Sequence, residues 1–232
     1  MRSGNVVNIT IDGKPHQVAE NTTLLQACRE AGVVVPTLCY MEGLNEEAAC
    51  SLCLVEIKGA KSLTRSCVTT PLEGMKISTN TPRVREARKT IVELLLANHP
   101  ADCLECERNQ NCELQKVADD LGVRKSPFEK TRPKDYELDD TSPSIIRDPN
   151  KCILCRRCVS ACTKIQSVYA IDTAQRGLSS VVTTYLDKGL GNVQCVNCGQ
   201  CLLVCPTGAI TERSEIDEVW EALSDKDKVV IV

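Results

Sequence analysis

Cysteine is the residue type that dominates this sequence. Sixteen of its 232 residues are cysteines, and fifteen of these fall into four groups. Thiolates bind zinc or iron-sulfur clusters, and they form disulfides in oxidising compartments. Because the first residues, MRSGNVVNITIDG, lack the apolar run of a secretory signal, we expect a cytoplasmic, reducing setting in which clustered cysteines bind metal.

Composition argues against two other function classes. The formal net charge is -3, and no basic run is interleaved with aromatic residues, so nucleic-acid binding is not expected. The longest apolar runs, residues 94–97 and 229–232, are far too short to span a membrane. With one Phe, one Trp and four Tyr, the aromatic surface that usually dominates a core is nearly absent.

The strongest pattern is a repeat. Residues 152–162 read CILCRRCVSAC and residues 195–205 read CVNCGQCLLVC, so C-x2-C-x2-C-x3-C occurs twice. In the bacterial ferredoxin run, three cysteines of one copy and the fourth of the other hold each four-iron cluster. We therefore predict two 4Fe-4S clusters, one held by Cys152, Cys155, Cys158 and Cys205, the other by Cys162, Cys195, Cys198 and Cys201. Zinc is the weaker alternative, because paired zinc ligands leave the third close cysteine of each run without a role.

A separate group of four cysteines lies in the first third of the chain. Its members are Cys39, Cys50, Cys53 and Cys67. The gaps of 10, 2 and 13 residues differ from the plant-type spacing, but four thiolates on the loops of one small domain suit a 2Fe-2S cluster. A structural zinc ion stays open as an alternative, because spacing alone does not exclude it.

The remaining group has only three cysteines. The stretch NHPADCLECERNQNC holds Cys103, Cys106 and Cys112, with His99 just before them. Imidazole is an accepted iron-sulfur ligand, so we predict that His99 completes a third 4Fe-4S site. Two alternatives are that His99 caps a helix, and that an open iron makes the chain an enzyme. No Gly-rich phosphate loop, G-x-S-x-G motif or paired carboxylates supports the enzyme.

The elements that must position these groups begin with a small sheet. Apolar and polar residues alternate on both sides of Asp12-Gly13, which predicts a tight hairpin, with His16 as a surface residue of its second strand. Another strand at residues 52–57 would complete the sheet. Together with the helix described next, this predicts a β-grasp domain over residues 1–80.

The first predicted helix covers residues 21–32. Asn21 or Thr22 is the expected N-cap, and Gly32 is the expected stop. Cys28 lies on the apolar face of this helix, where a buried free thiol behaves as a small hydrophobe, so a structural role is predicted for it.

Two further helices form the predicted middle domain, residues 81–125. Thr81 and Pro82 are a favourable start for the first, which Pro100 ends. The residues that follow helical spacing in it are Val84, Ala87, Arg88, Ile91, Leu94 and Leu95. The second covers residues 113–121 and closes at Gly122.

The rest of the chain divides into a linker, residues 126–147, a two-cluster ferredoxin-like domain, residues 148–213, and a tail, residues 214–232. In the tail, Ile216, Val219, Trp220 and Leu223 predict an amphipathic helix, and KVVIV predicts a strand that docks on another surface. The overall prediction is an α+β fold.

The order of the motifs resembles a known family. A 2Fe-2S group, then H-x3-C-x2-C-x5-C, then two C-x2-C-x2-C-x3-C runs, is similar to the N-terminal iron-sulfur region of FeFe-hydrogenase large subunits. It also resembles the iron-sulfur subunits of complex I and of NAD-linked formate dehydrogenases. The resemblance covers nearly the whole chain. It implies a relay in which the 2Fe-2S domain and the His-ligated cluster feed the ferredoxin-like pair.

By this resemblance, the chain is an electron-transfer subunit with no catalytic site for a substrate. The implied partners are a flavin and NAD(P)-binding iron-sulfur subunit and ferredoxin or a terminal redox centre, in a hetero-oligomer such as an electron-bifurcating hydrogenase. No cysteine remains after Cys205 for a hydrogen-activating cluster. The chain is thus either a natural short subunit or part of a longer hydrogenase or formate dehydrogenase subunit. A zinc-stabilised interaction scaffold is the alternative from another class.

Overall fold

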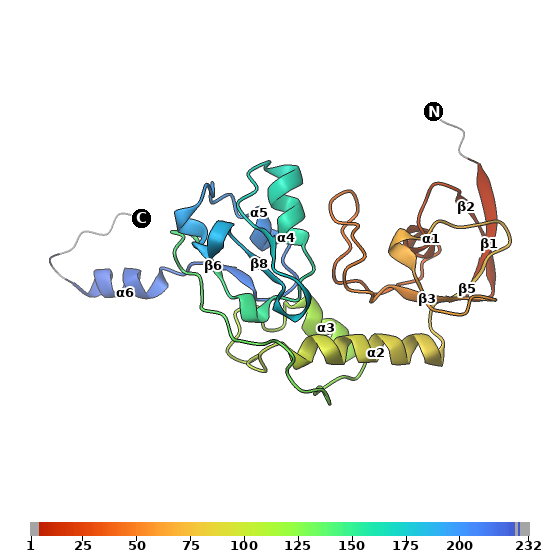
Figure 1. The fold of residues 1–232 in the computed structure, drawn as a ribbon, viewed down its shortest axis with the longest axis horizontal. Helices are drawn as coiled ribbons and strands as arrows, with labels where there is room; N and C mark the ends of the chain where they lie inside the picture. The colour runs from red at the N-terminus through yellow and green to blue at the C-terminus, as the bar shows by residue number, and fades with distance from the viewer. Residues whose placement is uncertain (1–4, 226, 228–232) are drawn as a thin grey trace.

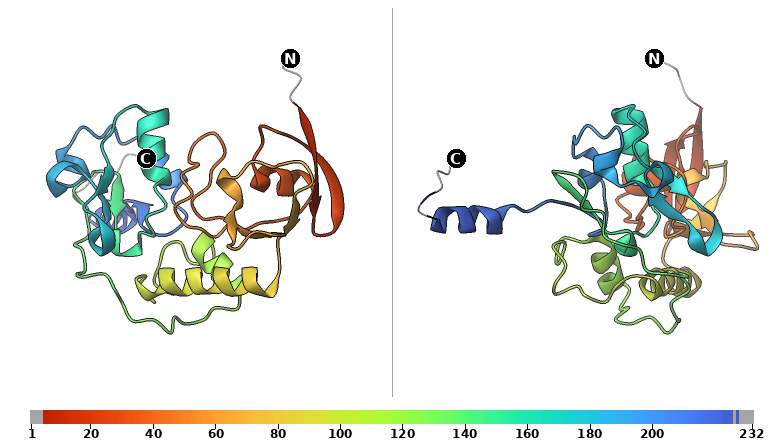
Figure 2. Two further views of the ribbon diagram at one scale, coloured as in Figure 1. Left: turned by 45° about the vertical axis from the view of Figure 1, so that its right-hand side comes forward. Right: turned by 60° about the vertical axis from the view of Figure 1, so that its left-hand side comes forward.

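The computed structural model describes residues 5–225 and residue 227, and it is a mixture of helices and strands, in agreement with the predicted α+β class. A sheet with one helix forms the N-terminal part, and short helices with strand pairs form the C-terminal part (Figure 1). The long helix α2 (Pro82–Ala97) runs from the first part to the second along one side of the molecule (Figure 2).

The N-terminal part is built on a five-stranded sheet with the order β2-β1-β5-β3-β4. Its strands are β1 (Val6–Ile11), β2 (Lys14–Ala19), β3 (Leu54–Ile57), β4 (Thr64–Arg65) and β5 (Lys76–Ser78). The predicted hairpin is present, and its turn residues Asp12 and Gly13 both have positive φ, at 48° and 84°. The prediction missed β4 and β5, which are too short to show alternation.

Helix α1 (Leu24–Glu30) packs its apolar face into the core of this part. The predicted N-cap was wrong by one residue, because Thr23 forms a capping box with Gln26. The Thr23 hydroxyl accepts from the Gln26 amide at 3.2 Å, and the Gln26 side chain accepts from the Thr23 amide at 3.0 Å. Cys28 is fully buried on the predicted face, and burial raises the pKa of its thiol to about 11.

Helices α2 and α3 (Glu113–Asp120) pack against each other. Thr81 caps α2 as predicted and accepts from the Val84 amide at 3.2 Å. Leu94 follows the predicted helical spacing but is 47% exposed, whereas Val92 is fully buried. Because α2 packs on both β3 and α3, its buried stripe passes through Val92 instead.

The C-terminal part contains two antiparallel strand pairs, β6 (Ile145–Arg147) with β9 (Ile210–Glu212), and β7 (Asp172–Ala174) with β8 (Val181–Thr183). Short helices lie between them: η2 (Pro149–Lys151), α4 (Arg157–Ser160), η3 (Ala161–Ile165), η4 (Gly177–Ser179), η5 (Tyr185–Asp187), η6 (Leu190–Asn192) and α5 (Gln200–Leu203). A further short helix, η1 (Ser66–Val68), belongs to the N-terminal part. Strand β6 lies inside the segment predicted as a linker, because three residues carry no periodic signal.

Helix α6 (Ile216–Ser224) is the amphipathic helix predicted for the tail. Its apolar residues face solvent, and Trp220 is 65% exposed. The helix projects away from the rest of the molecule (Figure 2). The predicted strand at residues 228–232 lies outside the described residues. Among the described residues, no helix is both long and apolar enough to cross a bilayer.

Candidate iron-sulfur sites

Two cavities in the C-terminal part are each lined by four cysteine side chains. The first is lined by Cys152, Cys155, Cys158 and Cys205. The second is lined by Cys162, Cys195, Cys198 and Cys201. Each cavity therefore takes three cysteines from one run and the fourth from the other, which is the exchange used by two-cluster ferredoxins.

The two runs use left-handed backbone at matching positions. Leu154 and Asn197 have φ of 56° and 52°, and Arg156 and Gly199 have φ of 65° and 73°. Right-handed and left-handed residues in alternation turn successive N–H groups toward one side, and such concavities bind anions, including iron-sulfur groups. The runs therefore share a local fold as well as a spacing.

Backbone amides point at the sulfurs of both runs, and burial raises the pKa of two thiols of the first cavity. The Leu154 amide lies 3.4 Å from Cys152 Sγ, and the Ala170 amide lies 3.3 Å from Cys162 Sγ. Burial raises the pKa of Cys152 to about 11 and that of Cys155 to about 12. Because buried thiolates need a compensating positive charge, this donor set fits a group with iron at its corners.

The four cysteines of the N-terminal part form two close pairs. The Sγ atoms of Cys53 and Cys67 are 3.2 Å apart, and the Cys50 backbone amide donates to Cys39 Sγ at 3.5 Å. A 2Fe-2S cluster needs two pairs of thiolates, one for each iron, whereas one zinc ion needs four sulfurs around a single centre. The paired arrangement therefore favours a 2Fe-2S cluster over zinc.

In each pair, one thiol ionises more easily than an ordinary cysteine. Hydrogen bonding to Cys39 lowers the pKa of Cys50 to about 6, and hydrogen bonding to Cys67 lowers the pKa of Cys53 to about 7. The same two hydrogen bonds raise the pKa of Cys39 and Cys67, so each pair holds one thiol that ionises more readily and one that ionises less readily.

His99 follows the end of α2, and its ring Nδ1 is buried without a hydrogen-bond partner. Burial lowers the pKa of His99 and so favours the neutral imidazole that ligates metals. The cysteines of this group lie on the loop that follows, where Cys103 is exposed and Cys106 and Cys112 are half-buried. A buried nitrogen with no partner fits a ligand position and gives no support to capping through that atom.

The loop of this third group packs directly on the end of the second cysteine run. The Arg108 guanidinium donates to the Cys205 carbonyl at 3.2 Å. At Gly208, an added Cβ would lie 2.7 Å from Cys106 Sγ. Gly208 is therefore required for this close approach, which brings the third group beside the first cavity.

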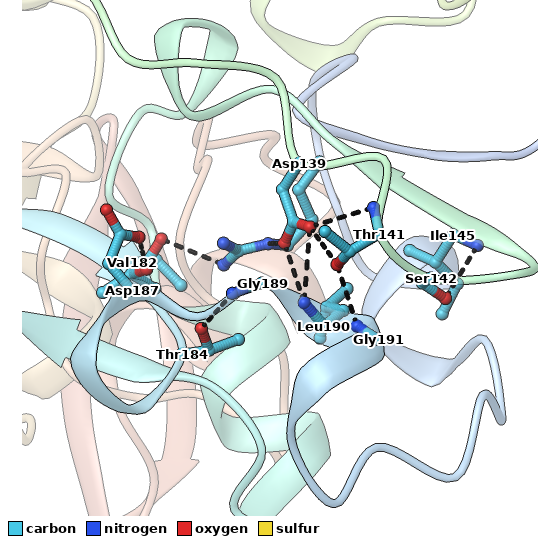
Figure 3. A network of polar contacts seen from close by, with 12 residues as sticks. Asp139, Thr141, Ser142, Ile145, Val182, Thr184, Asp187, Gly189, Leu190 and Gly191 are labelled. Atoms are coloured by element: carbon cyan, nitrogen blue, oxygen red, sulfur yellow. Dashed lines mark hydrogen bonds and ion pairs between the residues drawn. The ribbon is translucent and has the colours of Figure 1, made fainter.

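A buried ion pair joins β6 to the loops around it. Arg147 Nε lies 3.0 Å from Asp139 Oδ2, and the two side chains are 5% and 9% exposed. Asp139 also accepts from the Leu190 amide at 3.0 Å and from the Thr141 hydroxyl at 2.6 Å (Figure 3). Arg147 donates to the Val182 carbonyl at 3.2 Å and lines the first cavity. The network therefore places a buried cation beside four thiols.

Sequence reasoning missed three buried polar side chains beside the cysteine loops, Asn45, Arg147 and Arg157. Single polar residues in irregular segments carry no periodic signal. The one available cue was the position of Arg157 inside the run CILCRRC.

Three regions of the chain match models of known protein families. Residues 4–82 match a 2Fe-2S iron-sulfur cluster binding domain. Residues 88–127 match the NADH-ubiquinone oxidoreductase-G iron-sulfur binding region, and residues 142–211 match the ferredoxin-like domain of NADH-quinone oxidoreductase subunit 3. The three regions contain all four cysteine groups.

Curated relatives agree with these matches. The chain is 44% identical over 98% of its length to the NADP-reducing hydrogenase subunit HndD of Solidesulfovibrio fructosivorans. It is 37% identical over 88% of its length to an NADH-quinone oxidoreductase subunit of Rhizobium meliloti. The chain is a homologue of the iron-sulfur subunits of NAD(P)-linked hydrogenases and complex I-like oxidoreductases. This confirms the predicted resemblance to hydrogenases and complex I. This chain spans 40% of the length of the first relative and 24% of the length of the second.

A solved structure also resembles this chain. It is an NAD+-reducing NiFe-hydrogenase in the H2-reduced state, with a TM-score of 0.82 and 27% sequence identity. The match covers 90% of this chain and 88% of that chain. The fold of most of this chain therefore recurs in that structure.

Proposed function

We propose that this chain is an electron-relay module that holds one 2Fe-2S cluster and three 4Fe-4S clusters. Such clusters supply reversible one-electron transfer. The proposed ligands of the 2Fe-2S cluster are Cys39, Cys50, Cys53 and Cys67, and those of the third 4Fe-4S cluster are His99, Cys103, Cys106 and Cys112. The two sets from the ferredoxin-like runs hold the other two clusters. The observation that carries the proposal is that each run lends its fourth cysteine to the cavity of the other.

The proposed domain boundaries follow the cysteine groups. Residues 1–80 form a β-grasp 2Fe-2S domain, residues 81–125 a helical His-ligated domain, and residues 148–213 a two-cluster ferredoxin-like domain. Residues 126–147 connect the last two, and residues 214–232 form a docking tail. The five-stranded sheet with α1 supports the first assignment, and the packing of α2 on α3 supports the second.

The residues around the clusters are proposed to exclude water and to balance charge. Cys155, Cys158 and Cys205 are at most 7% exposed, so their sulfurs are shielded from solvent. Arg147 lines the same cavity and places positive charge beside them. Shielding from solvent and nearby positive charge both change the reduction potential of a cluster.

The partners are proposed from the names of the relatives. Those names refer to NADP, NADH and quinone, so the electron donor or acceptor at one end is an NAD(P)-linked flavoprotein subunit. Ferredoxin or a terminal redox centre serves the other end, within a hetero-oligomer. A reducing compartment such as the cytoplasm suits sixteen free cysteines, because it keeps thiols from pairing as disulfides.

Metal analysis of anaerobically purified chain tests the proposal. One 2Fe-2S and three 4Fe-4S clusters contain about fourteen irons, and acid-labile sulfide should match. Electron paramagnetic resonance should show several signals that appear on reduction and vanish on oxidation. A colourless chain with stoichiometric zinc would overturn the relay and favour an interaction scaffold.

A further inference from the structure

A fully buried asparagine joins the two parts of the molecule. Asn45 lies on the loop between Cys39 and Cys50, and its side chain has no exposed surface. Its Nδ2 donates to the carbonyl of Cys39 at 2.7 Å and to the carbonyl of Cys155 at 3.0 Å. One amide group therefore connects the 2Fe-2S cysteine set to the set of the first cavity.

The surroundings fix the orientation of this amide. Ser160, a buried residue of α4, donates its hydroxyl to Asn45 Oδ1 at 2.7 Å. Carbonyl oxygens can only accept, so Nδ2 must face both of them and Oδ1 must face Ser160. The Asn45 backbone is held as well, through paired bonds with Met41 at 2.8 and 2.9 Å. Any other arrangement of the side chain would leave buried polar groups unpaired.

A second bridge lies beside the first. Arg157 is 5% exposed, and its Nε donates to the same Cys39 carbonyl at 3.4 Å. Its two outer nitrogens bind the Glu113 carboxylate at 2.6 and 3.0 Å, and Glu113 directly follows Cys112. The Cys39 carbonyl therefore receives two donors from side chains that are themselves fixed, which makes this contact between the parts stiff.

We infer that Asn45 is a positioning residue that holds the 2Fe-2S set and the first 4Fe-4S set at a fixed separation and couples them electronically. The inference rests on the proposed function, which assigns Cys39 and Cys155 as ligands. The Asn45 side-chain nitrogen lies between the carbonyls of Cys39 and Cys155 and joins them through two hydrogen bonds. Electron tunnelling falls steeply with separation, so loss of this bridge slows exchange between the two sites.

Two variants of Asn45 test the inference in the cluster-loaded chain. Asn45→Leu has a similar size and removes both donors, and Asn45→Asp sets a carboxylate against two carbonyl oxygens. We expect electron exchange between the two sites to slow by about tenfold or more, since small displacements of reacting centres have large effects on rate. The magnetic interaction between the two reduced clusters, read from electron paramagnetic resonance, should weaken in both variants.

Ser66→Ala is the matched control. Ser66 is fully buried and donates to the carbonyl of Cys53 at 2.8 Å, so its loss removes the same kind of hydrogen bond within the N-terminal part alone. The magnetic interaction between the two sites should be unchanged in this variant. Ser160→Ala releases the Asn45 amide without removing either donor. We expect the magnetic interaction in this variant to be weaker than in Ser66→Ala and stronger than in the Asn45 variants.

Iron and sulfide content separates the outcomes. A wild-type chain without iron would overturn the proposed function itself. A loaded Asn45 variant with wild-type rate and wild-type magnetic interaction would overturn the role of Asn45 and leave the relay standing. If neither Asn45 variant retains its clusters, Ser160→Ala decides: a weakened interaction supports the role, and an unchanged one overturns it.

Discussion

At the scale of single residues, His99 is the side chain on which the proposed third 4Fe-4S cluster depends most. Its Nδ1 is buried without a partner, next to a loop that carries three cysteines. Replacing His99 with Cys keeps four ligands and adds a negative charge. We expect the reduction potential of this cluster to fall by on the order of 100 mV in an electron paramagnetic resonance redox titration.

The chain contains a second histidine that serves as the control. His16 lies on β2 and pairs with Ile9 of β1, away from the cysteine groups in sequence. His16→Ala should leave all cluster signals unchanged. A His99→Ala variant with the wild-type spectrum and potential would show that the imidazole is not a ligand.

The ion pair of Asp139 and Arg147 predicts a pH dependence of stability. Burial opposes ionisation of Asp139, but the hydrogen bond from Thr141 and the Arg147 guanidinium outweigh it and hold the pKa of this carboxyl below its ordinary value. A lowered folded-state pKa stabilises the fold above the unfolded-state pKa of about 3.9, and the stabilisation is lost as pH falls through the folded-state value.

Asp139→Asn tests this dependence. The variant leaves Arg147 as a buried cation without its carboxylate, so we expect a loss of about 3 kcal/mol in the free energy of unfolding at pH 7. The difference from wild type should stay constant between about pH 5 and 8, and it should shrink below about pH 4. Urea unfolding of both proteins across this range measures it, and a difference that shrinks between pH 8 and 5 would contradict the assignment.

At the residue scale, spacing was sufficient to group the cysteines but not to find their polar neighbours. The exchange of Cys162 and Cys205 between the runs follows from a known spacing rule, and the structure brings the expected sets together. Asn45 and Arg157 act through contacts between segments far apart in the chain. Asn45 bonds to Cys155, 110 residues away, and Arg157 bonds to Cys39, 118 residues away. Local sequence carries no trace of such contacts.

At the scale of elements, the approach of the third loop to the second run depends on one glycine. Gly208→Ala would place a Cβ 2.7 Å from Cys106 Sγ, and the sulfur or the backbone must then move. We expect this variant to lose the His99 cluster selectively. Iron content should fall toward about ten per chain, while the 2Fe-2S signal persists.

Gly199→Ala is the matched control, because its Cβ would meet nothing within 4 Å but its φ is +73°. That change should cost about 1 kcal/mol of stability through backbone strain and leave the His99 cluster in place. Equal loss of this cluster in both variants would show that close approach at Gly208 is not the cause.

The elements that were predicted correctly had strong local cues. Asp12-Gly13 favours the observed turn, and Thr81 with Pro82 favours the start of α2. Strands β4 and β6 have two and three residues, so their pairing comes from tertiary contacts and not from periodicity. Thr23 was missed as a cap because two other capping residues precede it, and only the reach of Gln26 decides among them.

At the scale of the whole molecule, we expect that helix α6 is not needed for the stability of the rest of the protein. Trp220 on this helix is 65% exposed, so Trp220→Glu should change the free energy of unfolding by no more than about 0.5 kcal/mol. Val92→Ala, at a fully buried position of α2, should cost roughly 2 kcal/mol in the same chemical denaturation experiment. A large loss from Trp220→Glu would show that α6 packs on the body.

The exchange of the fourth cysteine between the two runs has a consequence for biosynthesis. The first cavity of the C-terminal part lacks its fourth sulfur until Cys205 has been translated and has reached Cys152, and the second lacks three of its four until the run that contains Cys195, Cys198 and Cys201 has been translated. The set that ends at Cys67 is complete much earlier. Maturation enzymes can therefore load the N-terminal site on a nascent chain, but they must load the ferredoxin-like pair after synthesis has passed both runs. A ribosome that stalls between the runs would release a polypeptide able to mature at its front and incapable of maturing at its back.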